Sequence, residues 1–380
     1  MSDDSELIRE TARDFAQKRL APIAQAIDED EAFPRELFNE MGQLGLLGLG
    51  VPEIYGGTGA TFLSAAIAME ELSRVSAAVA LSYGAHAFLC AHNLYANADE
   101  AMRKKYLPKL CSGEWIGAFA LTEPEAGSDA ASLQTTAKKN GSGYVLNGAK
   151  MFITNGSIAD LFLVFARTER RPGVGPLSAF LVEREFKGLN TSRDIKKLGT
   201  RGSPLSEVLF QDCAVPAGNL IGEEGKGLNY MLRGLDMERA VFSGMAVGLV
   251  RASLDYSLNY ACQRRQFKQP VASFQLVQEM LAQMATDLEA GRLLVYQAAT
   301  MLDEGKTITK EASIAKLFVA QMAIRCTQMG VQILGGVGFT RECPVERYYR
   351  DAALLPIGGG TSQIQQLIIA KAMIKEHHKN

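Results

Sequence analysis

The hydrophobic periodicity of the chain changes twice, and this order of segments constrains the fold more than any other feature of the sequence. In residues 1 to about 113, apolar side chains such as Ile8 and Ala12 recur at intervals of three and four, which is typical of amphipathic helices. From about 115 to 216, short β-branched and aromatic runs lie between turn residues, which predicts strands. From about 227 the helical spacing returns and continues to the end.

Separate blocks of helices, strands and helices favour an α+β fold that is mostly α over an alternating parallel sheet. We therefore predict three domains: an N-terminal α-helical domain over residues 1–114, a middle β-domain over 115–226 and a C-terminal α-helical bundle over 227–380. No G-x-G-x-x-G pattern follows a predicted strand, so a Rossmann nucleotide site has no support.

Six strands are predicted in the middle domain. The dipeptides Asn140-Gly141 and Asn147-Gly148 are signals for tight turns between them. The predicted strands are Trp115–Leu121, Tyr144–Leu146, Phe152–Thr154, Leu161–Ala166, Ala179–Val182 and Glu207–Phe210.

Charge and hydropathy argue against several classes of partner. A formal net charge of −2 over 380 residues gives no electrostatic reason to bind nucleic acid or an anionic membrane. No stretch reaches the roughly 18 uninterrupted apolar residues of a membrane span. The N-terminus, MSDDSELIRE, is acidic and polar, unlike a targeting peptide. We expect a cytoplasmic protein, or a mitochondrial-matrix protein if a transit peptide was removed, with no nucleic-acid or membrane partner.

The six cysteines are scattered, with no C-x-x-C pair and no histidine at ligand spacing. In a chain of this length, that pattern is typical of reduced and mostly buried thiols in a reducing compartment. No metal site is predicted. The cysteines are Cys90, Cys111, Cys213, Cys262, Cys326 and Cys343.

Two segments carry residues suited to a ligand. The first, Ala-Leu-Thr-Glu-Pro-Glu-Ala-Gly-Ser-Asp at 120–129, follows the first predicted strand. Its small residues let the backbone approach a flat ligand, and Thr122 and Ser128 add hydroxyl donors. The alternative is an ordinary polar turn, because Gly-Ser-Asp is common turn chemistry.

The second segment, Gln-Ile-Leu-Gly-Gly-Val-Gly-Phe at 332–339, has three glycines in four residues at a predicted helix end. Glycines at this place allow positive φ and expose backbone N–H groups, which suits a diphosphate. The alternative is a helix C-cap with a glycine-rich loop.

Together the two segments resemble the two signature motifs of the acyl-CoA dehydrogenase family. The spacing from Gln332 through Glu342 and Arg347 to Asp351 matches throughout, and further matches cover nearly the whole chain. The resemblance implies a FAD enzyme with an N-terminal helical domain, a middle β-domain and a C-terminal four-helix bundle, assembled as a homotetramer. The further matches are Phe152-Ile153-Thr154-Asn155-Gly156, Arg264-Arg265-Gln266-Phe267, Phe274-Gln275 and Gly360-Thr361-Ser362-Gln363.

The resemblance also implies which residues hold FAD. Segments matching 119–128 and 152–154 line the isoalloxazine ring, and Thr122 bonds the flavin. Phe152 replaces a frequent Trp, which keeps an aromatic face and loses an N–H donor. The implied FAD-binding residues of these segments are Phe119, Leu121, Thr122, Gly127, Ser128, Phe152, Ile153 and Thr154.

A second set of implied FAD contacts comes from the C-terminal region. Arg264, Phe267, Gln275 and the segment Gln332, Ile333, Leu334, Gly335 and Gly336 match contacts to the FAD of a neighbouring subunit. Thr361 and Gln363 match residues near the ADP moiety.

The family reaction removes a proton from Cα of an acyl thioester while Cβ delivers hydride to the flavin, so a carboxylate must reach Cα. In most members this base is the Glu of a Tyr-Glu-Gly-Thr run, but the matching position here is Gly359. Glu238 matches the alternative base position of isovaleryl-CoA and long-chain members. We predict that Glu238 is the catalytic base, within a segment that opens a long helix. A solvated helix residue is the alternative.

The substrate contacts implied by the resemblance are Ser128, Tyr230, Arg239, Gly358 and Gly359. A glycine at 358, where the family often has Tyr, leaves room for a methyl branch on the acyl chain. The implied reaction is dehydrogenation of a short, branched acyl-CoA to the 2-enoyl-CoA, with electrons passed to an electron-transfer flavoprotein.

Two alternatives stay open. One is oxidation of a prolyl or other aminoacyl thioester on a carrier protein, and the other is a non-dehydrogenase flavoprotein of the same fold. His86 could also be considered catalytic, but on its predicted helix a structural role is favoured.

Overall fold

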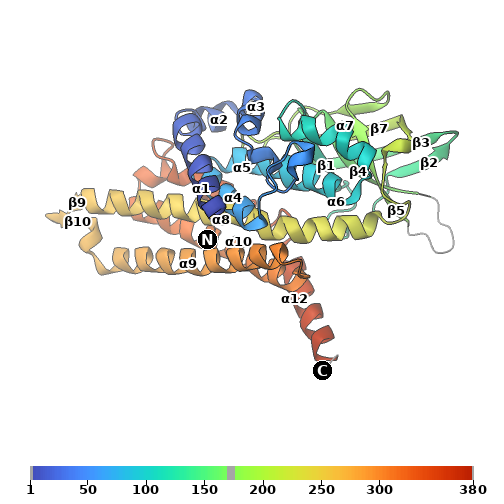
Figure 1. Ribbon diagram of the computed structural model, residues 1–380. Coiled ribbons are helices and arrows are strands. Elements are labelled where there is room, and N and C mark those ends of the chain that lie inside the picture. The colour runs from blue at the N-terminus through green and yellow to red at the C-terminus, as the bar shows by residue number, and fades with distance from the viewer. Residues whose placement is uncertain (1–2, 169–175, 379–380) are drawn as a thin grey trace.

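The computed structural model describes residues 3–168 and 176–378, which Figure 1 shows. The N-terminal block is helical, as predicted, and Thr61, Ser76 and Asp99 each cap a helix by accepting a hydrogen bond from the backbone N–H three residues later. The helices are α1 (Asp3–Phe15), α2 (Ala24–Asp30), α3 (Glu36–Gln43), α4 (Phe62–Ser73), α5 (Ala77–Gly84), α6 (Asn93–Asn97) and α7 (Glu100–Cys111), with π-helical turns η1 (Ala16–Leu20) and η4 (Ala85–His92) and 3₁₀ turns η2 (Leu46–Gly48) and η3 (Glu53–Tyr55).

The middle block forms a sheet in the order β6-β7-β3-β2-β4-β5-β8, and β1 joins it by parallel pairing with β4. The predicted turn at Asn140-Gly141 is confirmed, since it joins β2 to β3. The strands are β1 (Gly117–Ala120), β2 (Thr136–Asn140), β3 (Gly143–Thr154), β4 (Leu161–Arg167), β5 (Leu177–Glu183), β6 (Leu189–Thr191), β7 (Leu205–Pro216) and β8 (Leu220–Ile221). A 3₁₀ turn, η5 (Ala217–Asn219), joins β7 to β8.

The turn predicted at Asn147-Gly148 is wrong. This dipeptide lies inside β3, and the predicted strands 144–146 and 152–154 are parts of that one strand. The pairing of β3 with β7 shifts register at Gly148, where φ is 149° and a Cβ would lie 2.5 Å from Thr135 Oγ1. The glycine thus forms a β-bulge, which has the same residue preference as a turn.

The C-terminal block is a bundle in which α8 packs on α9 and α10, α9 packs on α10, and α12 packs on α10. In Figure 1 the yellow-to-orange helices α8 and α9 run lengthwise below the blue N-terminal helices. The predicted fold class is confirmed, while the domain limits at 114 and 226 stay a prediction. The elements are α8 (Gly227–Gln263), β9 (Arg265–Gln266), β10 (Gln269–Pro270), η6 (Val271–Ser273), α9 (Gln275–Asp303), α10 (Thr309–Leu334), η7 (Val337–Phe339), α11 (Val345–Ala352) and α12 (Ser362–His377).

The small β9–β10 hairpin interrupts the helical pattern that the sequence predicted to continue unbroken to about residue 335. Among the described residues, one helix, α10, has the length and apolar composition of a membrane span. Half of its apolar stretch is buried inside the protein, where it packs on α8 and α9. The core of the bundle therefore accounts for its composition.

Two buried carboxylates join the N-terminal helices to the bundle. Glu70 and Glu71 of α4 are almost fully buried. Arg251 of α8 contacts them at 3.2 and 2.9 Å, and Arg292 of α9 contacts Glu70 at 3.1 Å. Other packings of these helices would leave buried charges without partners, which costs several kcal/mol, about 3–5 in known cases. This network positions α8, the helix that carries Glu238.

Candidate active site

Glu238 lies on α8 about three turns after Gly227. The segment around it therefore does not open the helix as predicted. Its side chain is 8% exposed, and among the described residues its Oε2 atom has no hydrogen-bond partner. Burial raises the pKa of Glu238 to about 7, against the opposing effect of Arg239 and Lys316. A carboxyl group that titrates near neutral pH and keeps a free oxygen is suited to accept a proton.

Gly359 faces this carboxyl group from the loop between α11 and α12. Its φ is +66°, and a Cβ at this position would lie 2.8 Å from Oε1 of Glu238. Any side chain at 359 would therefore displace the carboxylate. At Gly358 the three atoms nearest to a Cβ would all belong to Leu354, the closest at 3.4 Å, which is ordinary van der Waals contact. A Cβ is thus tolerated at 358, whereas at 359 it would collide with the Glu238 carboxylate.

Three side chains from three helices hold the carbonyl groups of this glycine turn. Arg239 of α8 donates to Gly359 O at 3.3 Å, and Lys316 of α10 donates to Gly360 O at 2.6 Å. Gln365 of α12 donates to both oxygens, at 3.3 and 3.0 Å. Neither Lys316 nor Gln365 is among the residues predicted from the sequence. The signal that could have found them is a polar residue at a helix position that the apolar spacing predicts to face the core.

Arg239, which is predicted to contact substrate, is 6% exposed. Its guanidinium bonds Asp236 at 2.9 Å as well as the Gly359 carbonyl. Thr361 caps α12 by accepting the N–H of Ile364. Arg239 and Thr361 thus lie at the Glu238 turn, and their roles toward substrate and FAD stay predictions, as does that of the exposed Gln363.

The residues predicted to line the flavin from the middle domain lie at two strand ends. Phe119 is in β1, Leu121 and Thr122 follow it, and 152–154 end β3. The N–H of Met151 donates to Thr122 O at 2.8 Å and joins the two segments. The two segments therefore lie side by side and form one wall, in which the side chains of Leu121 and Ile153 are buried.

Phe152 presents its ring outward from this wall. Its φ is +58° and its side chain is 55% exposed, at a register shift in the pairing of β3 with β7. Such a backbone costs strain for a residue with a Cβ and persists only where the surroundings hold it. The buried Asn155 amide does so by donating to Ser82 O and Gly117 O, at 2.9 and 3.3 Å. An exposed, fixed aromatic ring fits the stacking of a planar isoalloxazine.

The wall lies beside α8, the helix that carries Glu238. Phe119 and Leu121 share one hydrophobic cluster with Tyr230, Met231 and Leu235 from the first turns of α8. The predicted substrate residue Tyr230 therefore lies between the sheet and Glu238 along the helix.

A buried ion pair behind the wall was not predicted. Lys150 Nζ lies 2.8 Å from Glu123 Oε1, and both side chains are nearly inaccessible. Lys150 also donates to Leu121 O at 3.1 Å, and Glu123 accepts the N–H of Thr135 at 3.0 Å. The pair fixes the loop that follows Thr122. Charged residues within apolar strand patterns could have signalled it.

Gly127 and Ser128 lie beyond this anchored loop and are exposed. A Cβ at Gly127 would meet nothing within 4 Å, so the chain there is open to a ligand. Ser128 is accessible as well, and its roles toward flavin and substrate stay predictions.

The predicted cross-subunit contacts lie at the opposite end of the bundle. Arg264, Phe267 and Gln275 are exposed at the β9–β10 hairpin, with Phe267 88% exposed (Figure 1). The helix between Glu238 and the end of α8 at Gln263 spans roughly 37 Å at 1.5 Å per residue. One chain therefore does not bring this set to its own Glu238.

The second glycine-rich segment lies near that same end. Gly330, on the last turns of α10, packs against Ser253 of α8. The helix ends at Leu334, and Gly335 has φ of +63°. Gln332, Gly335 and Gly336 are exposed, but the Leu334 side chain is buried, which leaves only its backbone for a ligand.

His86 joins β1 to the N-terminal helices. Its Nε2 lies 2.9 Å from Leu110 O, and its Nδ1 accepts the N–H of Gly117 at 2.9 Å. Burial lowers the pKa of His86 to about 4, so the ring is neutral. With both nitrogens engaged, His86 has the contacts of a structural residue.

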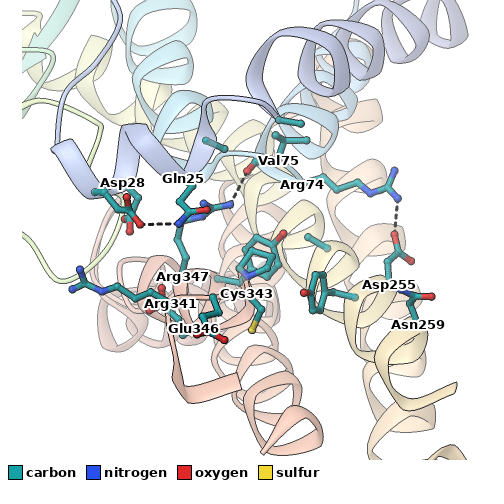
Figure 2. Close-up of a pocket in the computed structure, with 18 of the residues that line it drawn as sticks. Gln25, Asp28, Arg74, Val75, Asp255, Asn259, Arg341, Cys343, Glu346 and Arg347 are labelled. Atoms are coloured by element: carbon teal, nitrogen blue, oxygen red, sulfur yellow. Dashed lines mark hydrogen bonds and ion pairs between the residues drawn. The ribbon is translucent and has the colours of Figure 1, made fainter. Parts of the chain in front are cut away.

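A separate cleft of about 490 Å³ lies between the N-terminal helices and the segment before α11 (Figure 2). None of the predicted site residues lines it. Arg74 forms an ion pair with Asp255 at 2.7 Å, and Arg347 donates a hydrogen bond to Val75 O at 3.5 Å. Both arginines therefore already have contacts with other residues of the cleft. The Glu238 turn remains the better candidate for chemistry.

This three-part fold, with a buried carboxyl group on α8 and an exposed aromatic side chain in β3, agrees with comparisons to known families. The acyl-CoA dehydrogenase N-terminal, middle and C-terminal domains match residues 2–114, 118–213 and 225–374. The chain belongs to the acyl-CoA dehydrogenase family, whose members are FAD enzymes.

Individual relatives are similar over the whole chain. Mitochondrial isovaleryl-CoA dehydrogenase of Pongo abelii is 43% identical, covering 100% of this chain and 90% of the relative. Butyryl-CoA dehydrogenase from Megasphaera elsdenii has a TM-score of 0.96 at 39% identity, covering 98% of this chain and 99% of the other. The prolyl acyl carrier protein oxidase AnaB has a TM-score of 0.94 at 34% identity, covering 98% and 99%.

Proposed function

We propose that this acyl-CoA dehydrogenase oxidises a short, branched acyl-CoA to its 2-enoyl-CoA, with Glu238 as the base. FAD, when bound, accepts the hydride that leaves Cβ. Glu238 takes the proton from Cα, so one C–H bond is broken at each carbon and a double bond forms between them.

The observation that carries this proposal is the state of the Glu238 carboxyl group. It is buried, its Oε2 has no hydrogen-bond partner in the described part of the chain, and its pKa is raised to about 7 beside a glycine turn. A free carboxylate in a site that excludes water is a stronger base toward a bound thioester than one in solvent. Gly359 cannot serve, because it has no side chain.

The branched substrate is supported by the absence of a side chain at Gly358, where a Cβ would make ordinary van der Waals contact with Leu354, and by similarity to isovaleryl-CoA dehydrogenase. The prolyl thioester on a carrier protein is the second candidate, favoured by similarity to the prolyl acyl carrier protein oxidase. The isovaleryl group has a methyl branch at Cβ, and Cβ of the prolyl group is part of its ring. Oxidation of either group would use the same base.

Electron-transfer flavoprotein is the proposed acceptor, and a homotetramer is the proposed assembly. The exposed apolar side chains near the hairpin support the latter, since Phe267, Leu276 and Phe339 are 88%, 75% and 86% exposed in a single chain. We propose a cytoplasmic or mitochondrial-matrix location, as expected from the sequence.

One experiment tests the proposal. Purified protein is made anaerobic and mixed with isovaleryl-CoA, butyryl-CoA and a prolyl-loaded carrier protein, and bleaching of the flavin absorbance is followed. Fastest bleaching by isovaleryl-CoA supports the proposal. Bleaching by the prolyl carrier alone supports the second candidate, and no bleaching by any thioester contradicts both.

A further inference from the structure

Three side chains donate hydrogen bonds to the carbonyl groups of the glycine turn: Arg239, Lys316 and Gln365. Lys316 is the charged one that does not come from α8, the helix of Glu238. It lies on α10, is 8% exposed, and donates to Gly360 O at 2.6 Å. That carbonyl is neutral, so this hydrogen bond leaves the ammonium charge uncompensated. A buried ammonium in such a position is costly, and its effect on nearby groups is strong because water does not screen it.

The turn that Lys316 holds is flexible by composition. Gly359 and Gly360 have φ of +66° and +89°, and glycine adopts such angles without fixing them. A Cβ at Gly359 would already contact the Glu238 carboxylate at 2.8 Å. A small displacement of the turn toward α8 would therefore occupy the space in which Cα of a substrate must approach the base.

We propose that Lys316 is a positioning residue for the Glu238 base: through Gly360 O it anchors the glycine turn that faces the Glu238 carboxyl group, and it places an ammonium charge at that turn. This inference rests on the proposed function, in which Glu238 is the base.

The charged groups around Glu238 support the electrostatic half of this inference. From α8 comes Arg239, whose charge is shared with Asp236 at 2.9 Å, and from α10 comes Lys316. The glycine turn and Gln365 of α12 carry no charge. Of the two cations that act on Glu238, Lys316 is thus the one without an ion pair to a carboxylate among the described residues.

The two groups also influence each other. Burial raises the pKa of Glu238 to about 7 and lowers that of Lys316 to about 8, while each charge favours the charged form of the other. Between these values both groups are charged, and Glu238 is ready to accept a proton.

Four variants separate the two roles. Lys316→Met removes charge and donor, Lys316→Gln removes the charge but keeps a donor, and Lys316→Arg keeps both. Lys310→Met is the matched control, because Lys310 lies on the same helix and pairs with Glu376 at the surface.

The first measurement needs no substrate. The infrared carbonyl band of protonated Glu238, identified by its absence in Glu238→Gln, is titrated in the FAD-loaded protein. Loss of the cation should raise the Glu238 midpoint by about one pH unit in Lys316→Met and Lys316→Gln, with Lys316→Arg and Lys310→Met near wild type.

The second measurement is the pH profile of anaerobic flavin reduction. Its rise should shift by the same amount in the Met and Gln variants. At high pH the rate should fall roughly tenfold in Lys316→Met, where the turn is released, and less in Lys316→Gln. A purely structural lysine would change the yield of folded protein without moving either pH midpoint.

Wild-type midpoints in both charge-removing variants would overturn the inference. If Lys316→Met does not fold, the comparison of Gln with Arg still decides it. If no thioester reduces the wild-type flavin, the proposed function fails, whereas the infrared titration still tests the interaction of Lys316 with Glu238.

Discussion

Glu238 and Gly359 occupy one small space from two sides: the Cβ that any other residue would place at 359 lies 2.8 Å from Oε1 of Glu238. A side chain at 359 would therefore push the Glu238 carboxylate out of its present position. The glycine at 359 leaves room for that position.

Removing the base without changing its shape is the most direct test. Glu238→Gln should keep FAD and thioester binding, while flavin reduction falls at least about 10²–10⁴-fold, because the amide cannot accept the proton. Rapid-mixing spectroscopy measures this rate. Asp255→Asn, a surface substitution on the same helix, should leave the rate unchanged. Reduction of Glu238→Gln at the wild-type rate would exclude Glu238 as the base.

Moving the carboxylate to the loop should restore part of the activity. Glu238→Ala with Gly359→Glu vacates the space that Oε1 fills and places a carboxylate opposite it. The double variant should reduce its flavin at least about tenfold faster than Glu238→Ala alone. Full recovery is not expected, because residue 359 has positive φ and Gly358 gives the new side chain little support. Equal rates for the single and double variants would contradict this geometry.

The raised pKa of Glu238 predicts a pH-dependent stability. The carboxyl group ionises near 4.5 in the unfolded chain and near 7 in the folded chain, so wild type loses stability as pH rises through this window. The loss is roughly 3 kcal/mol at most. Urea unfolding of the FAD-loaded protein at pH 5 and pH 8 should show Glu238→Gln gaining stability over wild type at pH 8 only. An equal difference at both values would mean that burial does not raise this pKa.

Filling the space at residue 358 should change selectivity. Gly358→Tyr should impair oxidation of isovaleryl-CoA more than that of butyryl-CoA, since a lost methyl fit is worth about 1–3 kcal/mol, or roughly tenfold to a hundredfold. The ratio of kcat/KM for the two substrates measures the effect, and Gly358→Ala should show little of it. Proportional losses on both substrates would show that residue 358 does not accommodate the branch.

Residues of the β9–β10 hairpin should contribute to FAD binding, although they lie far from Glu238 of the same chain. Arg264→Ala and Phe267→Ala should weaken FAD binding about tenfold or more, and diluting the oligomer should release flavin in wild type as well. Fluorescence of released flavin against protein concentration measures both. Flavin retention that is independent of concentration and of these substitutions would place the cofactor within one chain.

The motifs determined the family, and the change of periodicity from helix to strand to helix determined the fold class, because both depend on residues close together in sequence. The sequence motifs also predicted the base, because the carboxylate that most family members have at position 359 is missing and a carboxylate is present at 238. Local signals could not separate the bulge at Gly148 from a turn, since both favour glycine and only the pairing with β7 distinguishes them.

Tertiary structure alone decided the surroundings of the base. Arg239, Lys316 and Gln365 meet at the glycine turn from three helices, and the burial that raises the pKa of Glu238 arises from the same packing. It also separated the wall at the ends of β1 and β3 from the β9–β10 hairpin by most of the length of α8. Distances of this kind depend on how helices pack across long stretches of chain, and neither periodicity nor motif spacing encodes them.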